Sequence, residues 1–482
     1  MRVNVLLVNP FYVSRHNDTR NYPSEPLGLL CLATYIDGMK DVEVSIVDFH
    51  KEGSEYAVKT KDGWRSGLTD AEILSCFDGY RPDVVGVTCN YTFGAANAFR
   101  VAELAKRWNS KVITVLGGAH ATLESENIVR LPSVDFVVAG EGERAFAWML
   151  EQITQRNRIC VPIIQKPQIE DLDVLPMPYR GFIRYKDYLR DCYFHPKQKP
   201  VGTMSTSRGC MFRCAFCSTQ VTWGNHWRGR SAQKMLDECL YLRDRYGVRE
   251  VAFQDDQLLG SRERMEAFCK LAIERKLGMT FIAPPGMSPG RMTPELLRLM
   301  RDAGFYRICF SVDVGNEKAA RWVKKPVKLS RMRTLVRTAN RLGLWTYGTF
   351  IMGFPNETSA DLRETVRYAY GLGLDFLRFY IAQPHAGTEL HAWYAERGLL
   401  PADMDKDHDI MDAVSDTPNI KADKLVRLRN EAEMGYMRFF LIRLIVRLDE
   451  IIPKLWTWSR LVYAIKLVIL GWKIRVRFKG IP

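Results

Sequence analysis

Three cysteines stand close together in the segment RGCMFRCAFCS, residues 208–218. Cys210, Cys214 and Cys217 follow the spacing C-x3-C-x2-C, whereas the other eight cysteines of the chain are isolated from one another. Three thiolates on one short loop can bind three irons of a [4Fe–4S] cube, which leaves the fourth iron without a protein ligand. A molecule that carries an amine and a carboxylate can chelate that iron. The spacing therefore indicates an iron–sulfur centre with one open position.

A structural zinc site is the alternative for this loop. Zinc takes four ligands and favours paired C-x2-C or C-H spacings. The fourth ligand would have to come from elsewhere, with Cys192 and His226 as the candidates. Because the loop directly follows an expected strand, where a β/α barrel carries its chemistry, we favour the cluster.

An alternation of strand and helix signals surrounds the cysteine loop and is expected to position it. Residues 199–395 contain six short apolar runs with helix-like stretches between them. The expected strands are 203–208, 250–255, 279–284, 306–312, 345–352 and 375–381. This pattern predicts a partial (β/α)6 barrel, similar to a TIM barrel, with its chemistry at the carboxyl ends of the strands.

A second alternation occupies residues 1–150. Its near-continuous apolar runs, separated by helix-like stretches, predict an α/β domain with a doubly wound parallel sheet, which binds ligands at the carboxyl ends of its strands. The expected strands are 3–10, 42–49, 83–90, 111–118 and 134–140. Residues 151–198 include the proline-containing run DLDVLPMPYR and are expected to form a linker. Residues 396–482 are expected to form a helical tail.

The tail carries much of the net charge of +14, because residues 434–482 contain ten Lys or Arg and two Asp or Glu. No uncharged run reaches the ~18 residues needed to span a bilayer. We expect an in-plane amphipathic anchor, with a helical cap on the barrel as the alternative. With no targeting segment visible, we expect a cytoplasmic protein in peripheral contact with the inner face of the membrane. The cations at near-helical spacing are Arg443, Arg447, Lys454, Arg460 and Lys466, and the interfacial aromatics are Trp456, Trp458 and Trp472.

The cysteine loop and the barrel together resemble the radical S-adenosylmethionine (SAM) superfamily. The resemblance implies that Cys210, Cys214 and Cys217 hold a [4Fe–4S] cluster whose open iron binds SAM. It also implies SAM contacts from the aromatic before the last cysteine, from polar residues after the second strand that meet the amino group, from an acid after the fourth strand near the ribose, and from backbone of the fifth strand against the adenine. Asp313 stands where the family more often has Glu. The residues with this expected role are Phe216, Gln254, Asp255, Asp256, Asp313, Ile351 and Gly353.

A doubly wound domain ahead of such a barrel resembles the cobalamin-binding branch of this family. The resemblance implies a cobalamin at the carboxyl edge of the first sheet, the alternative being a domain that has lost its ligand. The expected contacts are Thr88, Asn90, Tyr91, Gly117, Gly118, Gly140, Glu141 and Gly142. His50 lies in DFHKEG, which matches a cobalt-ligating signature of another cobalamin family. That signature follows the first strand rather than the second, so we do not expect His50 to bind cobalt.

The resemblance implies an enzyme that methylates an unactivated carbon of a small, hydrophobic biosynthetic intermediate. One SAM would supply a radical, and a second SAM would supply the methyl group through cobalamin. The alternative is a non-methylating enzyme that cyclises or rearranges a tetrapyrrole or lipid, and a distant one is a zinc or cobalamin sensor. We expect an external electron donor of the flavodoxin or ferredoxin type. Nucleic acid is not an expected partner, because no RNA-binding appendage with stacking aromatics is evident.

Overall fold

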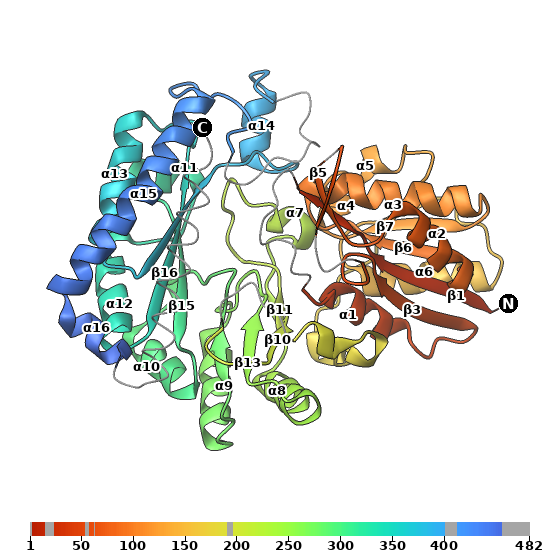
Figure 1. The fold of residues 1–482 in the computed structure, drawn as a ribbon, viewed down its shortest axis with the longest axis horizontal. Coiled ribbons are helices and arrows are strands. Elements are labelled where there is room, and N and C mark those ends of the chain that lie inside the picture. The colour runs from red at the N-terminus through yellow and green to blue at the C-terminus, as the bar shows by residue number, and fades with distance from the viewer. Residues whose placement is uncertain are drawn as a thin grey trace. The chain divides into compact units, whose positions relative to one another are not determined.

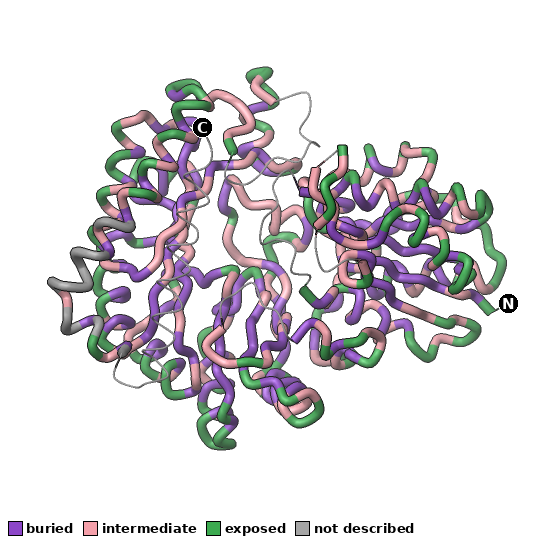
Figure 2. Tube along the Cα trace, viewed as in Figure 1, coloured by how far each residue is buried: buried purple, intermediate pink, exposed green. Residues whose placement is uncertain are grey.

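The computed structural model describes residues 2–14, 24–53, 57–61, 63–189, 196–400 and 412–455. The chain forms two compact units (Figure 1). Of the described residues, the first unit comprises those up to 189 together with 218–226, and the second comprises 196–217, 227–400 and 412–455. In both units the buried residues follow the central strands, whereas exposed residues line the outer helices (Figure 2). Each unit therefore has its own core.

The first unit is built on a six-stranded sheet in the order β3-β1-β6-β7-β8-β9, with every pairing parallel. Its strands are β1 Val3–Asn9, β3 Val42–Asp48, β6 Val84–Thr88, β7 Ile113–Gly117, β8 Phe136–Val138 and β9 Ile163–Ile164. Its helices are α1 Leu27–Ile36, α2 Asp70–Tyr80, α3 Ala95–Trp108, α4 Ala119–Leu123, α5 Ser125–Ile128 and α6 Gly142–Thr154. One apolar cluster includes residues of α2 and α3, and another includes residues of α1 and α6. The predicted doubly wound sheet is thus confirmed.

A small antiparallel sheet in the first unit was not predicted from the sequence. It has the order β2-β5-β4, with β2 at Tyr12–Ser14, β4 at Val58–Thr60 and β5 at Gly63–Ser66. These strands are three or four residues long, too short for an alternating apolar pattern to stand out. The expected linker also contains structure, because it holds β9 and three short 3₁₀ helices, Leu172–Val174, Arg180–Phe182 and Tyr185–Asp187.

The second unit contains the six strands predicted for the barrel. Two three-stranded parallel sheets, β10-β13-β14 and β15-β16-β17, are joined by single bridges between Phe281 and Phe305 and between Met287 and Phe310. The strands are β10 Val201–Met204, β13 Glu250–Phe253, β14 Thr280–Ile282, β15 Arg307–Asp313, β16 Trp345–Met352 and β17 Phe376–Ile381. The helices are α8 Ala232–Tyr246, α9 Arg262–Glu274, α10 Pro294–Ala303, α11 Glu317–Val323, α12 Leu329–Arg341, α13 Ser359–Gly371 and α14 Glu389–Ala395. This is the partial β/α barrel that the sequence indicates.

The described part of the tail packs on the barrel. Helix α15, Ala422–Val446, runs beside the last strand, where Arg429 Nε donates to Phe379 O at 2.9 Å and Phe379 N donates to Glu433 Oε1 at 3.0 Å. Side chains of the helix thus satisfy backbone groups of an edge strand, which would otherwise remain open for pairing with another chain. The following helix α16, Leu448–Leu455, contacts α12. For residues 422–455 the structure therefore matches the helical cap.

Lys454 corrects one expectation about the tail. We expected it on an outward cationic face, but its side chain is fully buried, donates to Asn340 Oδ1 at 2.7 Å and pairs with Asp375. The periodicity of the cations did not reveal this, because the partner carboxylate lies 79 residues earlier in the chain. None of the helices in the described ranges combines the length and apolar composition that crossing a bilayer requires. Residues 456–482, including the three tryptophans, fall outside those ranges.

Candidate functional site: a cysteine loop and a glycine-lined sheet edge

The cysteine loop follows β11, a two-residue strand at Ser207–Arg208, and is held by backbone hydrogen bonds. Cys217 N donates to Cys214 O at 3.0 Å, and Ala215 N donates to Val323 O at 3.0 Å. Leu390 N donates to Ala215 O at 2.9 Å. The end of α11 and the start of α14 therefore fix the loop from outside the strands.

The thiols of the loop are close enough to affect one another. Burial raises the pKa of Cys214 to about 12, and the neighbouring Cys217 and Cys210 raise it further, whereas Lys325 lowers it. Burial also raises the pKa of Cys210, with Cys217 again a contributor. Three adjacent thiols form a donor set that fits three corners of an iron–sulfur cube. Within the described residues, no three His, Cys, Asp or Glu side chains converge on a single metal ion.

His226, one of the two candidate fourth ligands for zinc, has a carboxylate partner. The imidazole of His226 lies 3.5 Å from the carboxylate of Glu170, and both residues belong to the first unit. Cys192 lies outside the described residues.

Asp313, at the end of β15, is tied to two neighbours. Its carboxylate accepts from Lys325 Nζ at 2.5 Å and from Thr349 Oγ1 at 3.0 Å. Burial alone would lower the pKa of Lys325, but Asp313 and Cys214 outweigh burial, so this pKa is raised. Asp313 also has a φ of +61°, a left-handed conformation that Asp tolerates better than most residues. The carboxylate predicted near the SAM ribose is therefore already paired with a cation beside the cysteine loop.

The two aspartates after β13 diverge, as neighbouring residues of an extended chain do. Asp255 is buried, and its Oδ1 accepts from Thr206 N at 3.1 Å and from Ser207 Oγ at 2.5 Å. Its Oδ2 is buried without a hydrogen-bond partner in the described structure, and burial raises the pKa of this carboxyl. Asp256 is exposed and close enough to Cys210 to raise the pKa of that thiol. Gln254 N donates to Met204 O at 2.8 Å, which joins the second strand to the first.

The loop after β16 places an aromatic group against the cysteine loop. The ring of Phe216 lies 5.6 Å from that of Phe354, and Trp322 of α11 lies 5.9 Å from Phe354 on centroid distances. Glu357 accepts from Gly353 N and Phe354 N, each at 2.9 Å, and burial raises its pKa to about 7. A buried carboxyl thus fixes the backbone at the predicted adenine contact.

Glycine is required at residue 353 for a reason the sequence did not reveal. Its φ is +92°, and an added Cβ would lie 2.4 Å from Leu425 Cδ2 of α15. Ile351, the other expected adenine contact, is half-buried on β16 and pairs in register with Tyr380 on β17. Packing of α15 of the tail therefore favours glycine at residue 353, in addition to any effect of a bound ligand.

One face of the β16–β17 pair is only half-buried and carries the polar side chains. Tyr347, Thr349 and Ile351 share that face of β16, opposite Phe376, Arg378 and Tyr380 of β17. The charge of Arg378 is neutralised by Glu433 of α15, whose Oε2 lies 2.8 Å from Arg378 Nη1. Burial raises the pKa of Tyr347 well above its usual value, so its hydroxyl stays protonated. This wall offers aromatic rings, hydroxyls and one neutralised cation to a bound molecule.

In the first unit, two glycine turns end neighbouring strands and are joined by one threonine. Gly118 follows β7 with a φ of +115°, and Gly140 follows β8 with a φ of +77°. Thr122 Oγ1 donates to Gly118 O at 2.8 Å and accepts from Gly140 N at 2.8 Å. A Cβ at Gly118 would lie 2.4 Å from Asn90 Oδ1 and 2.8 Å from Cys89 O. Glycine at residue 118 therefore lets the turn after β7 pack directly on the loop after β6. The two turns, which we call the glycine cradle, present backbone without side chains at the carboxyl edge of the sheet, and this fits the close approach of a bulky ligand such as cobalamin.

The loop after β6 borders the same edge. Thr88 ends the strand half-buried, and Asn90 is exposed. Tyr91 is 63% exposed, and its ring stacks on Phe93 at 5.0 Å. Gly117 ends β7, where an added Cβ would stand 3.7 Å from Val138 O. The structure therefore brings these expected cobalamin contacts to one sheet edge.

Other expected residues have structural partners in the first unit. Glu141 is buried and accepts from Ile169 N at 2.6 Å, and Gly142 begins α6. Burial lowers the pKa of His50 to about 4, and its Nε2 is buried without a hydrogen-bond partner in the described structure. Asp48 accepts from the backbone N of His50 and from Tyr188 Oη, so it does not orient the imidazole. Glu141 therefore supports the backbone at Ile169 through its hydrogen bond, and the ring of His50 is not oriented by Asp48.

Sequence reasoning missed Lys325, Glu357 and Thr122. Lys325 and Thr122 act through contacts that only folding creates, with Asp313 and Gly140 respectively. Glu357 acts by accepting hydrogen bonds from backbone N–H groups. A signal was present for Glu357, because the run GFPNE places an acid shortly after a strand end.

Comparison with known proteins agrees with this architecture. The Radical SAM superfamily matches residues 204–369, and the B12 binding domain matches residues 17–149. The cytidylyl-2-hydroxyethylphosphonate methyltransferase of Streptomyces wedmorensis is 31% identical over 443 residues, covering 80% of each chain. The anaerobic magnesium-protoporphyrin IX monomethyl ester cyclase of Rubrivivax gelatinosus is 26% identical and covers 82% of this chain and 72% of its own.

A solved structure supports the fold. The radical SAM methyltransferase TsrM from Kitasatospora setae, determined with cobalamin and a [4Fe–4S] cluster bound, superposes with a TM-score of 0.67 at 18% identity. The superposition covers 82% of this chain and 78% of TsrM. Together with the methyltransferase relative and the two matched domains, it shows that this chain belongs to the cobalamin-binding radical SAM enzymes.

Proposed function

We propose that this enzyme transfers a methyl group to an unactivated carbon of a small, largely apolar substrate. The observation that carries the proposal is the presence, in one chain, of a three-thiol loop at the carboxyl ends of barrel strands and a glycine cradle at the carboxyl edge of a second sheet. When bound, a reduced cluster would supply the electron for cleavage of SAM, and cobalamin would supply the methyl group.

The protein's own residues bind and orient these groups. Cys210, Cys214 and Cys217 would hold the cluster through their three thiolates, which leaves one iron for SAM. Gln254, Asp256 and Asp313 stand at strand ends where they would meet the polar parts of SAM, while Phe216, Ile351 and Gly353 would meet the adenine. Asp255 would hold the loop in place rather than contact SAM directly, since Oδ1 is committed to Thr206 and Ser207.

The sheet edge of the first unit would receive cobalamin. Gly117, Gly118 and Gly140 allow close approach to the backbone, and Thr88, Asn90 and Tyr91 would border the ring. Glu141 and Gly142 would support the second turn, because Glu141 already binds a backbone amide. His50 would not ligate cobalt, because its Nε2 is buried and Asp48 is committed elsewhere.

The half-buried wall of β16 and β17 supports a substrate with an extended apolar surface. Tyr347 and Tyr380 present rings with one hydroxyl each, and the charge of Arg378 is balanced by Glu433. Radicals react with water and with nearby groups, so the wall would also limit solvent access.

A test that requires no substrate separates methylation from cyclisation. The anaerobically reconstituted protein is mixed with SAM, added cobalamin and a chemical reductant, and 5′-deoxyadenosine and S-adenosylhomocysteine are both quantified. A methyltransferase forms S-adenosylhomocysteine in step with methylation of the cobalamin. 5′-Deoxyadenosine without S-adenosylhomocysteine would reject methylation and favour the cyclase alternative that the Rubrivivax relative represents.

We also propose that tail residues beyond Leu455 make peripheral contact with an anionic membrane. Six further Lys or Arg and no Asp or Glu follow that residue. Sedimentation with vesicles of anionic lipid tests this, with a chain ending at residue 455 as the control. Equal sedimentation of both proteins would contradict the proposal.

A further inference from the structure

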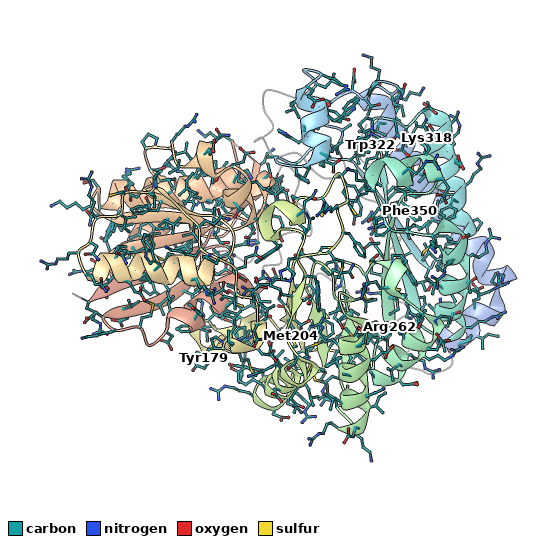
Figure 3. The ribbon with its side chains drawn as sticks, turned by 180° about the vertical axis from the view of Figure 1, so that it is seen from behind. Tyr179, Met204, Arg262, Lys318, Trp322 and Phe350 are labelled. Carbon is teal, nitrogen blue, oxygen red and sulfur yellow. The ribbon has the colours of Figure 1, made fainter. Side chains whose placement is uncertain are left out.

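Helix α11 turns a cationic face outward. Its buried residues are Ala319, Ala320 and Val323, whereas Lys318 and Arg321 are exposed, as are Glu317 at the start of the helix and Lys324, which follows it as the C-cap. Figure 3 shows Lys318 and Trp322 on this helix. Lys318 pairs with Asp361 and Lys324 with Glu389, whereas Arg321 makes no ion pair within the described part of the chain.

This face lies one hydrogen bond from the cysteine loop. Val323 O, at the end of α11, accepts from Ala215 N at 3.0 Å, and Ala215 directly follows Cys214. Lys324 is the next residue after Val323 and is exposed. Since electron tunnelling slows steeply with distance, a redox partner seated here would have a short path of covalent and hydrogen bonds to Cys214.

The segment from the start of α11 to the end of α12 carries an unusual charge for this chain. Residues 317–341 contain nine Lys or Arg, one Glu and no Asp, a net charge of +8. Apart from this segment and the basic tail, the rest of the chain is slightly acidic. A concentrated positive field accelerates the approach of an acidic protein and fixes its orientation.

The start of α12 also breaks a local rule of helix electrostatics. Lys328 occupies its N-cap, Arg331 follows in the first turn, and that turn has no acidic residue. Cations at a helix N-terminus oppose the helix dipole by roughly 0.3–1 kcal/mol each. Both side chains are exposed and make no ion pair in the described structure, so their charge is retained at a cost to the helix. Such conflicts with local preference are expected at functional surfaces.

We propose that Arg321, Lys324 and Lys328 form a docking surface for an acidic one-electron carrier protein. This inference rests on the proposed function, because the electron is delivered to the cluster of the cysteine loop. The carrier loses one electron from its reduced flavin or iron–sulfur group. The [4Fe–4S] centre gains that electron and passes from the 2+ to the 1+ state, and no bond or proton moves.

The test compares two charge-reversal variants of the reconstituted full chain. The first is a double variant, Arg321→Glu and Lys328→Glu, which reverses two charges of the proposed surface. Lys234→Glu with Lys270→Glu makes the same change in charge at exposed positions of α8 and α9 and is the matched control. Reduction of the cluster by a reduced bacterial flavodoxin is followed by stopped-flow absorbance at low ionic strength. Flavodoxin binding is measured separately by isothermal titration calorimetry.

We expect the surface variant to be reduced by flavodoxin about tenfold more slowly, with weaker binding and less dependence on salt. The control variant should match the wild type, and both variants should react normally with dithionite. A surface variant that binds and accepts electrons from flavodoxin as fast as the control would overturn the proposal. So would loss of sedimentation with anionic vesicles at an unchanged flavodoxin rate, because the face would then be a membrane contact. Failure of dithionite to reduce the wild-type centre would instead contradict the proposed function.

Discussion

Lys325 donates a hydrogen bond to Asp313 at 2.5 Å beside the cysteine loop, and the side chains of both residues are about one-tenth exposed. Removing one partner of such a pair leaves a buried charge without compensation. We therefore expect Asp313→Asn to lower the free energy of unfolding by about 3 kcal/mol, measured by urea denaturation. Asp423→Asn, which breaks an exposed pair with Arg427, should cost less than about 1 kcal/mol. Equal losses in the two variants would contradict the role assigned to Lys325.

The glycine cradle makes a prediction about cobalamin. Gly118→Ala places a Cβ against Asn90 and the backbone of Cys89 at a φ of +115°, so we expect cobalamin to be lost on gel filtration. Gly79→Ala is the control, because nothing lies within 4 Å of an added Cβ there and its φ is not positive. That change in α2 should leave cobalamin binding intact and stabilise the helix by roughly 0.5–1 kcal/mol. Normal cobalamin retention by Gly118→Ala would argue against this edge as the binding site.

Glu357 predicts a pH dependence of stability. Burial raises the pKa of its carboxyl from 4.5 to about 7, so its contribution to stability is complete below pH 4.5 and is lost as the pH rises through 7. Glutamine can still accept from Gly353 N and Phe354 N, yet it carries no charge. Between pH 5 and pH 8, we expect the wild type to lose on the order of 2–3 kcal/mol of unfolding free energy relative to Glu357→Gln. Parallel pH profiles of the two proteins would show that the carboxyl is not perturbed.

The main parallel strands of both units were predictable from the sequence, because parallel strands buried on both faces leave continuous apolar runs. Strand β16 begins and ends at the predicted residues, 345 and 352. The cysteine loop was equally visible, since its three residues are neighbours in sequence. The three-residue strands β2 and β4 are too short to leave a pattern.

Contacts between distant segments were not predictable. Lys454 was expected among outward cations, and only the folded chain reveals Asp375 and Asn340 around it. Glu141 was expected at cobalamin, but its partner is the backbone of Ile169, which no side-chain pattern reports. Gly353 suggested a ligand contact, whereas its φ of +92° and the packing of Leu425 of the tail also disfavour a side chain there.

The buried pair between Lys454 and Asp375 makes the tail part of the barrel's stability. Lys454→Met leaves the Asp375 carboxylate buried without its cation, and we expect a loss of about 3–5 kcal/mol in unfolding free energy. Lys421→Met, which breaks an exposed pair with Asp416, should cost less than about 1 kcal/mol. Thermal and urea unfolding compare the two variants. If the tail did not pack on the barrel, the two variants would lose the same small amount of unfolding free energy.

The prediction that one iron of the cluster has no protein ligand and binds SAM is tested most directly by electron paramagnetic resonance of the dithionite-reduced protein with and without SAM. We predict about four irons per chain, a signal of a reduced [4Fe–4S] cluster, and g-values that change when SAM is added. Cys214→Ala should lose both the iron and the signal, whereas Cys160→Ser, at an exposed isolated cysteine, should keep them. Bound zinc in place of iron, or a cluster signal that SAM leaves unchanged, would contradict it.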